Sequence, residues 1–199
     1  MSLNLFAELH ADDDTMARLH RRLERDAGAD DLLDVAYRTV DSPVGPLLLA
    51  ATTIGLVRVA YGIEDHDAVL AKLASTVSPR VLRAPARLDD AARQLDEYFA
   101  KRRDHFEVPV DLRLAEGFRR SVIEHLRDIG YGRRESYAEV AAAVGSPRAV
   151  RAVGTACAHN PLPVVIPCHR VVRSDGSTGQ YVGGPAAKAA LLDLEAARE

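Results

Sequence analysis

Residues 136–159 read SYAEVAAAVGSPRAVRAVGTACAH, and their local signals decide the fold of the second half of the chain. Ser136 is expected to cap a helix over 137–144, because a serine at this position accepts a hydrogen bond from a backbone amide in the first turn. Glu139 stands three residues further on and completes the pattern of a capping box. The stretch therefore predicts a short helix with a defined start.

The residues after this helix predict a sharp turn and a second helix. Gly145 suits the position that follows a helix end, and Pro147 suits the first position of a helix that runs to about His159. Two short helices joined by a tight turn are typical of a helix-turn-helix, although an αα-corner in a helical bundle has the same pattern. Arg148 and Arg151 on the predicted second helix, with no acidic residue beside them, favour a protein that reads nucleic acid.

Charge is distributed unevenly along the chain. The 199 residues have a formal net charge of -3, yet residues 117–174 hold nine arginines against four acidic residues. Residues 1–116 hold 15 basic against 21 acidic residues. A concentrated arginine stretch in a mildly acidic protein is typical of a local surface for a polyanion, while a solvated surface in an arginine-rich protein is the alternative.

Composition excludes several classes of protein. With 47% hydrophobic and 28% charged residues, the chain can bury the core of one average domain or two small ones and is not a disordered protein. No apolar run approaches the roughly 20 residues that span a bilayer, and the N-terminus lacks the pattern of a signal peptide. Cys157 and Cys168 are the only cysteines, so neither a disulfide framework nor a four-cysteine zinc site is expected. A cytoplasmic protein with reduced thiols is predicted.

Residues 1–34 are expected to form an N-terminal extension. Residues 12–15 can cap a helix in which Met16, Leu19 and Leu23 recur at helical spacing. A docked amphipathic helix and a loosely ordered extension both fit this pattern, and no chemistry is assigned to it.

Residues 35–113 predict a small α/β domain. Three short β-rich runs are separated by turn residues, and two helical patterns and an extended run at 106–112 follow. Such closely spaced runs predict antiparallel strands, and no residue of this half is expected to be catalytic. With a mostly helical second domain at 117–199, the expected fold class is α+β.

The residues with the most chemistry follow the predicted second helix. A buried apolar run ends at Pro167 and leads directly to Cys168, His169 and Arg170. A cysteine reacts as its thiolate, and an unperturbed thiol with a pKa of about 8.5 is only a few per cent ionised at pH 7. His169 could supply a base and Arg170 a positive field, although neighbours on a strand point to opposite faces. A nucleophile and an inert buried cysteine are both compatible with this pattern.

Taken together, these segments resemble the O6-alkylguanine-DNA alkyltransferase family, also called methylated-DNA–protein-cysteine methyltransferases. The specific core is the sequence PCHR, with Asn-Pro upstream and Tyr-x-Gly-Gly downstream at fitting spacing. The matching segments are Ser136-Tyr137, Arg151-Ala152-Val153-Gly154, Asn160-Pro161, residues 166–171, residues 179–184, Lys188 and residues 191–195. The resemblance is strong over 118–197 and weaker over 37–112, where residues 42–47 are similar to the family's first hairpin.

The resemblance implies repair of DNA by direct, irreversible and stoichiometric transfer of an alkyl group from O6-alkylguanine, and from O4-alkylthymine, to a cysteine of the protein. The target base must first be flipped out of the duplex. Double-stranded DNA is the implied partner, without a cofactor, a metal, a membrane or an obligate protein partner. Two alternatives remain: a module that binds alkylated DNA without repairing it, and a cysteine hydrolase that uses Cys168, His169 and Glu195.

The resemblance also implies catalytic roles. Cys168 would accept the alkyl group, and His169 would take its proton through a bound water. Glu195 would hold His169 and stabilise its charge. Asn160 would brace the turn before the reactive segment, and Tyr137 would donate a hydrogen bond to ring nitrogen N3 of the departing guanine.

Further residues would bind the base and the DNA. The carbonyls of Cys168 and Val171 would accept from the exocyclic amine of the base, the Val182 amide would address its oxygen, and Tyr181 would line the pocket. Arg151 would enter the duplex and fill the place of the flipped nucleotide. The remaining predicted DNA-binding residues are Arg148, Arg134 and Ser136.

Three departures from the family pattern are visible. The chain has no tryptophan, although the family often has one in the helix before the helix-turn-helix. Gly130 replaces a frequent proline, which is expected to loosen the lead into the DNA-binding unit without affecting the chemistry. The first half has no cysteine, so the structural zinc of some relatives is not expected here.

Overall fold

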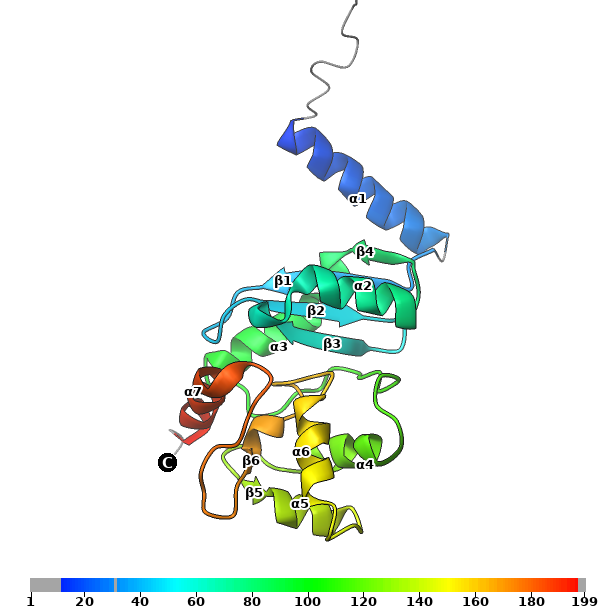
Figure 1. Ribbon diagram of the computed structural model, residues 1–199. Coiled ribbons are helices and arrows are strands. Elements are labelled where there is room, and N and C mark those ends of the chain that lie inside the picture. The colour runs from blue at the N-terminus through cyan, green and yellow to red at the C-terminus, as the bar shows by residue number, and fades with distance from the viewer. Residues whose placement is uncertain (1–11, 31, 197–199) are drawn as a thin grey trace, which may run out of the picture.

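The computed structural model describes residues 12–30 and 32–196 and arranges them as a sheet-containing half above a mostly helical half (Figure 1). The sheet has four strands in the order β3-β2-β1-β4. They are β1 (Val35–Val40), β2 (Leu47–Ala51), β3 (Leu56–Tyr61) and β4 (Val81–Arg83). The first three pair antiparallel, as predicted, whereas β4 is parallel to β1. Three residues are too few to show alternation, so the sequence did not reveal β4.

Helices cover both faces of this sheet. They are α2 (His66–Thr76) and α3 (Asp89–Phe99), with short 3-10 turns η1 (Gly62–Glu64) and η2 (Pro85–Leu88). Successive strand residues point to opposite faces. Val35 and Val57 pack with Leu73 of α2, whereas Ala36 and Val59 join the larger cluster that contains α3.

The extended run predicted at 106–112 is not a full strand. It makes one isolated parallel bridge, in which the Leu56 amide donates to the Pro109 carbonyl at 2.8 Å and the Leu56 carbonyl accepts from the Asp111 amide at 2.8 Å. A Cβ atom on Gly55 would lie 2.4 Å from the Pro109 oxygen, so glycine is needed where this segment passes the sheet.

The helical half holds four helices and a two-stranded sheet. The helices are α4 (Gly117–Leu126), α5 (Tyr137–Ala143), α6 (Val150–Ala158) and α7 (Gly184–Ala196), and the strands are β5 (Glu135–Ser136) and β6 (Val171–Val172), with a 3-10 turn η3 (Cys168–Arg170) before β6. One buried cluster runs through both halves, from Leu49 and Leu95 to Val153 and Leu191. Cys168 belongs to the same cluster, so the segment around it lies at a packed junction of the two halves.

The helix-turn-helix is confirmed with one correction. Ser136 caps α5 in a capping box with Glu139, and Gly145 has a φ of 71° at the turn. The predicted start of the second helix at Pro147 is wrong. Residues 147–148 form a turn closed by a hydrogen bond from the Ala149 amide to the Ser146 carbonyl, and α6 begins only at Val150.

Helix α1 (Asp13–Ala29) decides between the two alternatives for this segment in favour of a helix. Asp12 caps it, and a contact between His20 Nε2 and the Arg83 carbonyl at 2.6 Å ties it to β4. Met16, Leu19 and Leu23 are each about half exposed, so most of the apolar stripe is uncovered. Among the described residues, no helix combines the length and apolar character needed to cross a membrane.

Candidate active site

Cys168 lies in a strained, tightly bonded segment. The side-chain Nδ2 of Asn160 donates to Cys168 Sγ at 3.1 Å and to the Ile166 carbonyl at 2.8 Å, while Asn160 Oδ1 accepts from the Leu162 backbone amide at 3.0 Å. Val164 has a φ of 72°, a left-handed conformation that β-branched residues rarely adopt. The turn over 160–167 is thus fixed by one buried asparagine, which places the thiol.

His169 and Glu195 form the buried pair that the sequence predicted. His169 Nε2 lies 3.0 Å from Glu195 Oε1, and both side chains are almost fully buried. An ionised carboxylate only accepts hydrogen bonds, so Nε2 carries the proton and Nδ1 holds the lone pair. Nδ1 is buried and has no hydrogen-bond partner among the described residues. The free nitrogen of His169 is therefore a basic one.

Arg170 holds the other side of the carboxylate. Its Nε and a terminal nitrogen lie 2.9 Å and 2.8 Å from the two oxygens of Glu195, and the Gly132 amide donates to Oε2 at 3.1 Å. These bonds, with those from His169, hold the pKa of Glu195 well below its usual range despite its burial. Glu195 is thus a fixed negative charge.

Burial sets the resting protonation of the thiol and the imidazole. It raises the pKa of Cys168 to about 11, against the lowering effects of the Asn160 hydrogen bond and the Lys188 charge. It lowers the pKa of His169, and the Glu195 hydrogen bond opposes this only in part. At neutral pH the site therefore holds a protonated thiol beside a neutral imidazole, not a preformed thiolate.

Tyr137 and Tyr181 line the space near the thiol from two sides. Tyr137 is half-buried at the start of α5, and a Cβ on Gly179 would lie 2.4 Å from its hydroxyl. The Tyr181 ring stands edge-on to His169, with centroids 6.3 Å apart. Glycine at 179 lets the loop over 173–183 close against Tyr137.

Two of the groups predicted to bind the base are backbone carbonyls that already accept hydrogen bonds within the protein. Lys188 is fully buried and donates to the Val171 carbonyl at 2.6 Å, and the Cys168 carbonyl accepts from the Val171 amide. A carbonyl has two lone pairs, so each can accept one further hydrogen bond. Val182 lines a groove of about 670 Å³ that also reaches Asn160 and Pro161.

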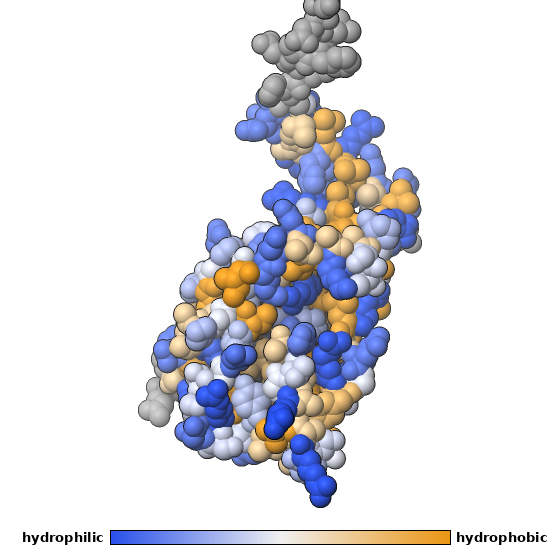
Figure 2. All heavy atoms as spheres, in the orientation of Figure 1, coloured by the Kyte–Doolittle hydropathy of each residue, from blue (hydrophilic) through white to orange (hydrophobic). Residues whose placement is uncertain are grey.

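Arg134, Arg148 and Arg151 are exposed, and none of the three makes an ion pair with a residue in the described part of the chain. Arg151 lies in the first turn of α6, as predicted. Arg148 was also predicted to lie on this helix, but it lies in the turn before it. Strongly hydrophilic residues project at the end of the molecule where Figure 1 places α5 (Figure 2). The surface beside the helix-turn-helix offers free positive charge.

The first half, in which no catalytic residue was expected, nevertheless contacts the site. The Tyr98 hydroxyl, from α3, donates to Glu195 Oε1 at 2.7 Å, and the Tyr61 hydroxyl lies 2.9 Å from that of Tyr181. Neither tyrosine stands in a reactive motif, and contacts between segments about 100 residues apart leave no local signal. The helical pattern of this segment carried no sign of a contact with the second half.

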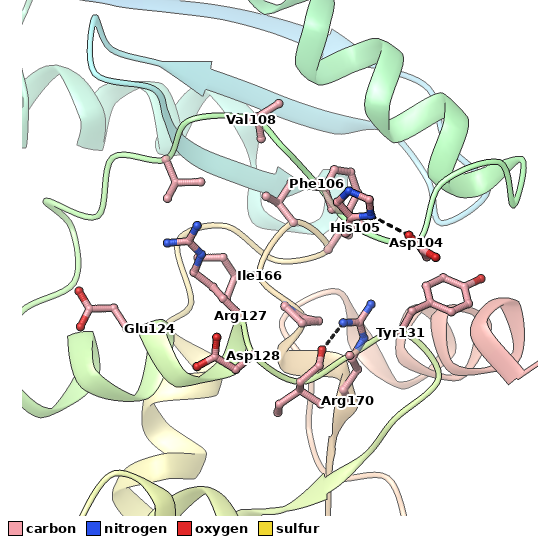
Figure 3. Close-up of a pocket in the computed structure, with 16 residues that line it drawn as sticks. Asp104, His105, Phe106, Val108, Glu124, Arg127, Asp128, Tyr131, Ile166 and Arg170 are labelled. Atoms are coloured by element: carbon pink, nitrogen blue, oxygen red, sulfur yellow. Dashed lines mark hydrogen bonds and ion pairs between the residues drawn. The ribbon is translucent and has the colours of Figure 1, made fainter.

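A cavity of about 460 Å³ lies where the halves meet (Figure 3). Asp104, His105 and Phe106 line one side, and Tyr131 and Arg170 line the other. The Arg170 guanidinium donates to the Ile129 carbonyl at this wall. Cys168 and His169 do not line the cavity, so it adjoins the charged network and is not the place of the thiol.

Two family descriptions match the chain. The "6-O-methylguanine DNA methyltransferase, ribonuclease-like domain" matches residues 35–112, and the "6-O-methylguanine DNA methyltransferase, DNA binding domain" matches residues 117–197. No described group of three or more histidine, cysteine, aspartate or glutamate residues could hold a metal ion.

Curated proteins and solved structures agree with these matches. The methylated-DNA--protein-cysteine methyltransferase of Mycobacterium tuberculosis (strain H37Rv) is 39% identical over 170 residues, covering 82% of this chain and 94% of the relative. The constitutive enzyme of Bacillus subtilis is 38% identical over 160 residues, covering 80% and 94%. The crystal structure of M. tuberculosis OGT in complex with DNA superposes with a TM-score of 0.71 at 39% identity, covering 82% and 94%.

Proposed function

Because the chain belongs to the 6-O-methylguanine DNA methyltransferase family, we propose that Cys168 is its alkyl acceptor and His169, set by Glu195, the base. The protein repairs DNA by transferring the alkyl group of O6-alkylguanine in duplex DNA to one of its own cysteines. The proposal assigns the residues that carry out this transfer, and it adds O4-alkylthymine as a second substrate. The observation that carries it is the buried His169 whose Nε2 faces Glu195 and whose Nδ1 is free.

The first step moves the thiol proton. At pH 7, a thiol with a pKa of about 11 is ionised in roughly one molecule in 10⁴, so transfer must couple to a base. The neutral His169 takes the proton at Nδ1, through a water molecule, and becomes an imidazolium. Glu195 stabilises that charge, because it accepts from Nε2 and stays ionised.

The second step displaces guanine at the alkyl carbon. Cys168 Sγ forms a bond to the carbon as the carbon–O6 bond breaks, and the bonding electrons go to O6. Tyr137 donates a hydrogen bond to N3 of the leaving base, and the proton that His169 took from the thiol passes to the guanine anion, which leaves as neutral guanine. The thioether product has no proton to lose and no leaving group, so each molecule reacts once.

The bases must reach this site by leaving the duplex. A stacked base cannot bring O6 to a thiol that is 1% exposed, so the base is flipped at a cost of a few kcal/mol. We place Arg151 in the gap, and Arg134, Arg148 and Ser136 at the DNA backbone, because these arginines are exposed and unpaired within the described chain. Val171, Tyr181 and Val182 contact the flipped base.

The proposal includes the organisation and location of the chain. We assign 35–113 as a supporting domain, 117–199 as the DNA-binding and acceptor domain, and 1–34 as an extension outside both. We place the protein in the cytoplasm, because Cys168 is a free cysteine that must stay reduced to react.

Mass spectrometry of the intact protein tests the proposal. After mixing with excess duplex that contains O6-methylguanine, we expect one added methylene mass, about 14 Da, and one base repaired per protein. Binding without a mass change would instead support a non-repairing DNA-binding module. Repeated turnover of an ester substrate would support a cysteine hydrolase.

A further inference from the structure

Besides Arg170, two donors from different halves of the molecule share one oxygen of Glu195. The Tyr98 hydroxyl donates to Oε1 at 2.7 Å, and His169 Nε2 donates to the same oxygen at 3.0 Å. Tyr98 is 0% exposed and Glu195 is 3% exposed, so no solvent competes for this oxygen. The shorter of the two bonds comes from α3, which carries none of the reacting groups.

Tyr98 is itself held rigidly. Its ring packs at a tilt on Phe106, with centroids 5.2 Å apart, and edge-on to Tyr131, with centroids 6.1 Å apart. Tyr131 in turn lies under the Arg170 guanidinium and donates from its hydroxyl to the Leu194 carbonyl at 3.1 Å. This packing holds the Tyr98 hydroxyl within hydrogen-bond distance of Glu195 Oε1.

We infer that Tyr98 is a positioning residue for alkyl transfer, whose hydroxyl fixes the carboxylate oxygen that orients His169. The inference rests on the proposed function of His169 and Glu195. Arg170 bridges both carboxylate oxygens, and the Gly132 amide donates to Oε2 at 3.1 Å. The Tyr98 hydroxyl donates to Oε1, the oxygen that faces His169 Nε2, and holds that oxygen from the side of the first half. The supporting half thereby completes the acceptor site.

The inference predicts a pH effect with a definite sign. The charged and titratable groups around His169 are Glu195, Arg170, Lys188, Cys168, Tyr98 and Tyr181. Without the Tyr98 hydroxyl, Oε1 bears more unshared charge and attracts the His169 proton more strongly. The pKa of His169 rises, so the acid side of the rate profile moves to higher pH.

Tyr98→Phe tests this, since it removes one oxygen and keeps the ring. The single-turnover rate on the free base O6-benzylguanine is measured from pH 5 to 8. We expect the rate at pH 7 to fall about three- to tenfold and the acid midpoint to rise by about half a pH unit. Tyr61→Phe is the matched control: it removes the other hydroxyl bond between the halves, to Tyr181, and should leave the midpoint in place.

A double-mutant cycle with Glu195→Gln separates positioning from packing. If Tyr98 acts through the carboxylate, Tyr98→Phe should change the rate of the Glu195→Gln protein by less than about twofold. Two results would overturn the inference. One is a Tyr98→Phe protein whose acid midpoint is unmoved and whose rate is within twofold of the parent. The other is an equal loss of rate when Tyr98→Phe is made in the parent and in the Glu195→Gln protein. A parent protein that takes no benzyl group on Cys168 would instead refute the proposed function itself.

Discussion

The two cysteines of this protein have similar burial and different neighbours. Cys157, near the end of α6, is 6% exposed, and Cys168 is 1% exposed. Burial raises the pKa of both thiols. Among the described residues, only Cys168 has a donor at its sulfur, Asn160, and it is followed by a histidine whose free nitrogen is basic. Under the proposed function, burial alone leaves Cys157 inert, and the adjacent base makes Cys168 reactive.

Replacing the Cys168 thiol is expected to have the largest effect on the rate of alkyl transfer. Cys168→Ser should abolish alkyl transfer, by at least about 10³-fold, because a hydroxyl has a pKa far above that of any thiol and yields no anion here. Duplex binding should persist. Single-turnover repair of an O6-methylguanine duplex, with binding measured by fluorescence anisotropy, checks both expectations.

Cys157→Ala is the matched control for this loss. It should keep the parent rate, because Cys157 has no role in the proposed reaction. Transfer that survives in Cys168→Ser and vanishes in Cys157→Ala would reverse the assignment of the two thiols.

Removing the charge that supports the base should have the next largest effect. Glu195→Gln should slow alkylation about 100-fold, because the His169 imidazolium loses its counter-charge. It should also lower the free energy of unfolding by about 3 kcal/mol, because Arg170 is left buried without a carboxylate. Rates on O6-benzylguanine and urea unfolding measure the two effects. A loss confined to DNA affinity would contradict the role of Glu195.

The pH profile tests whether His169 acts as a neutral base. Its pKa is lowered by burial, so the imidazole should stay unprotonated at pH 6.5, where an exposed histidine is half charged. The alkylation rate should therefore hold level to below pH 6.5 and then fall about tenfold per pH unit. An acid midpoint above 6.5 in the parent protein would mean that Glu195 stabilises a charged resting His169.

Arg151 tests the DNA contacts proposed for α6. Helix α6 carries Arg151 in its first turn and Cys157 near its last residue. Arg151→Ala should slow repair of a duplex about tenfold and leave the reaction of free O6-benzylguanine within about twofold, because a free base leaves no gap to fill. Equal loss on both substrates would mean that Arg151 shapes the site or the fold.

Arg148→Ala and Arg134→Ala are the controls for this comparison. If these residues meet only phosphates, each should reduce the salt dependence of binding by about one unit of slope and affect all duplexes alike. A change limited to alkylated duplexes would place them at the base instead.

Local sequence signals predicted much of the fold, but they did not predict the residues that hold the site from a distance. The capping box at Ser136 and the turn at Gly145 were readable because a few adjacent residues determine them. The start of α6 was misplaced by three residues, because Pro147 fits a turn as well as a helix start. Within the site, the family resemblance pointed to His169 and Glu195, which the structure brings together. Tyr98 stayed hidden, because its contact joins segments 97 residues apart.

Mapping the methyl group tests the central claim most directly. The parent protein is reacted with a duplex that contains one O6-methylguanine, at pH 7 and pH 9, then digested and analysed by tandem mass spectrometry. We predict one methyl group per molecule on Cys168 and none on Cys157 at either pH, since only Cys168 has a base beside it. Methylation of Cys157 at either pH, or of Cys168 only at pH 9, would contradict the claim that His169 activates the acceptor.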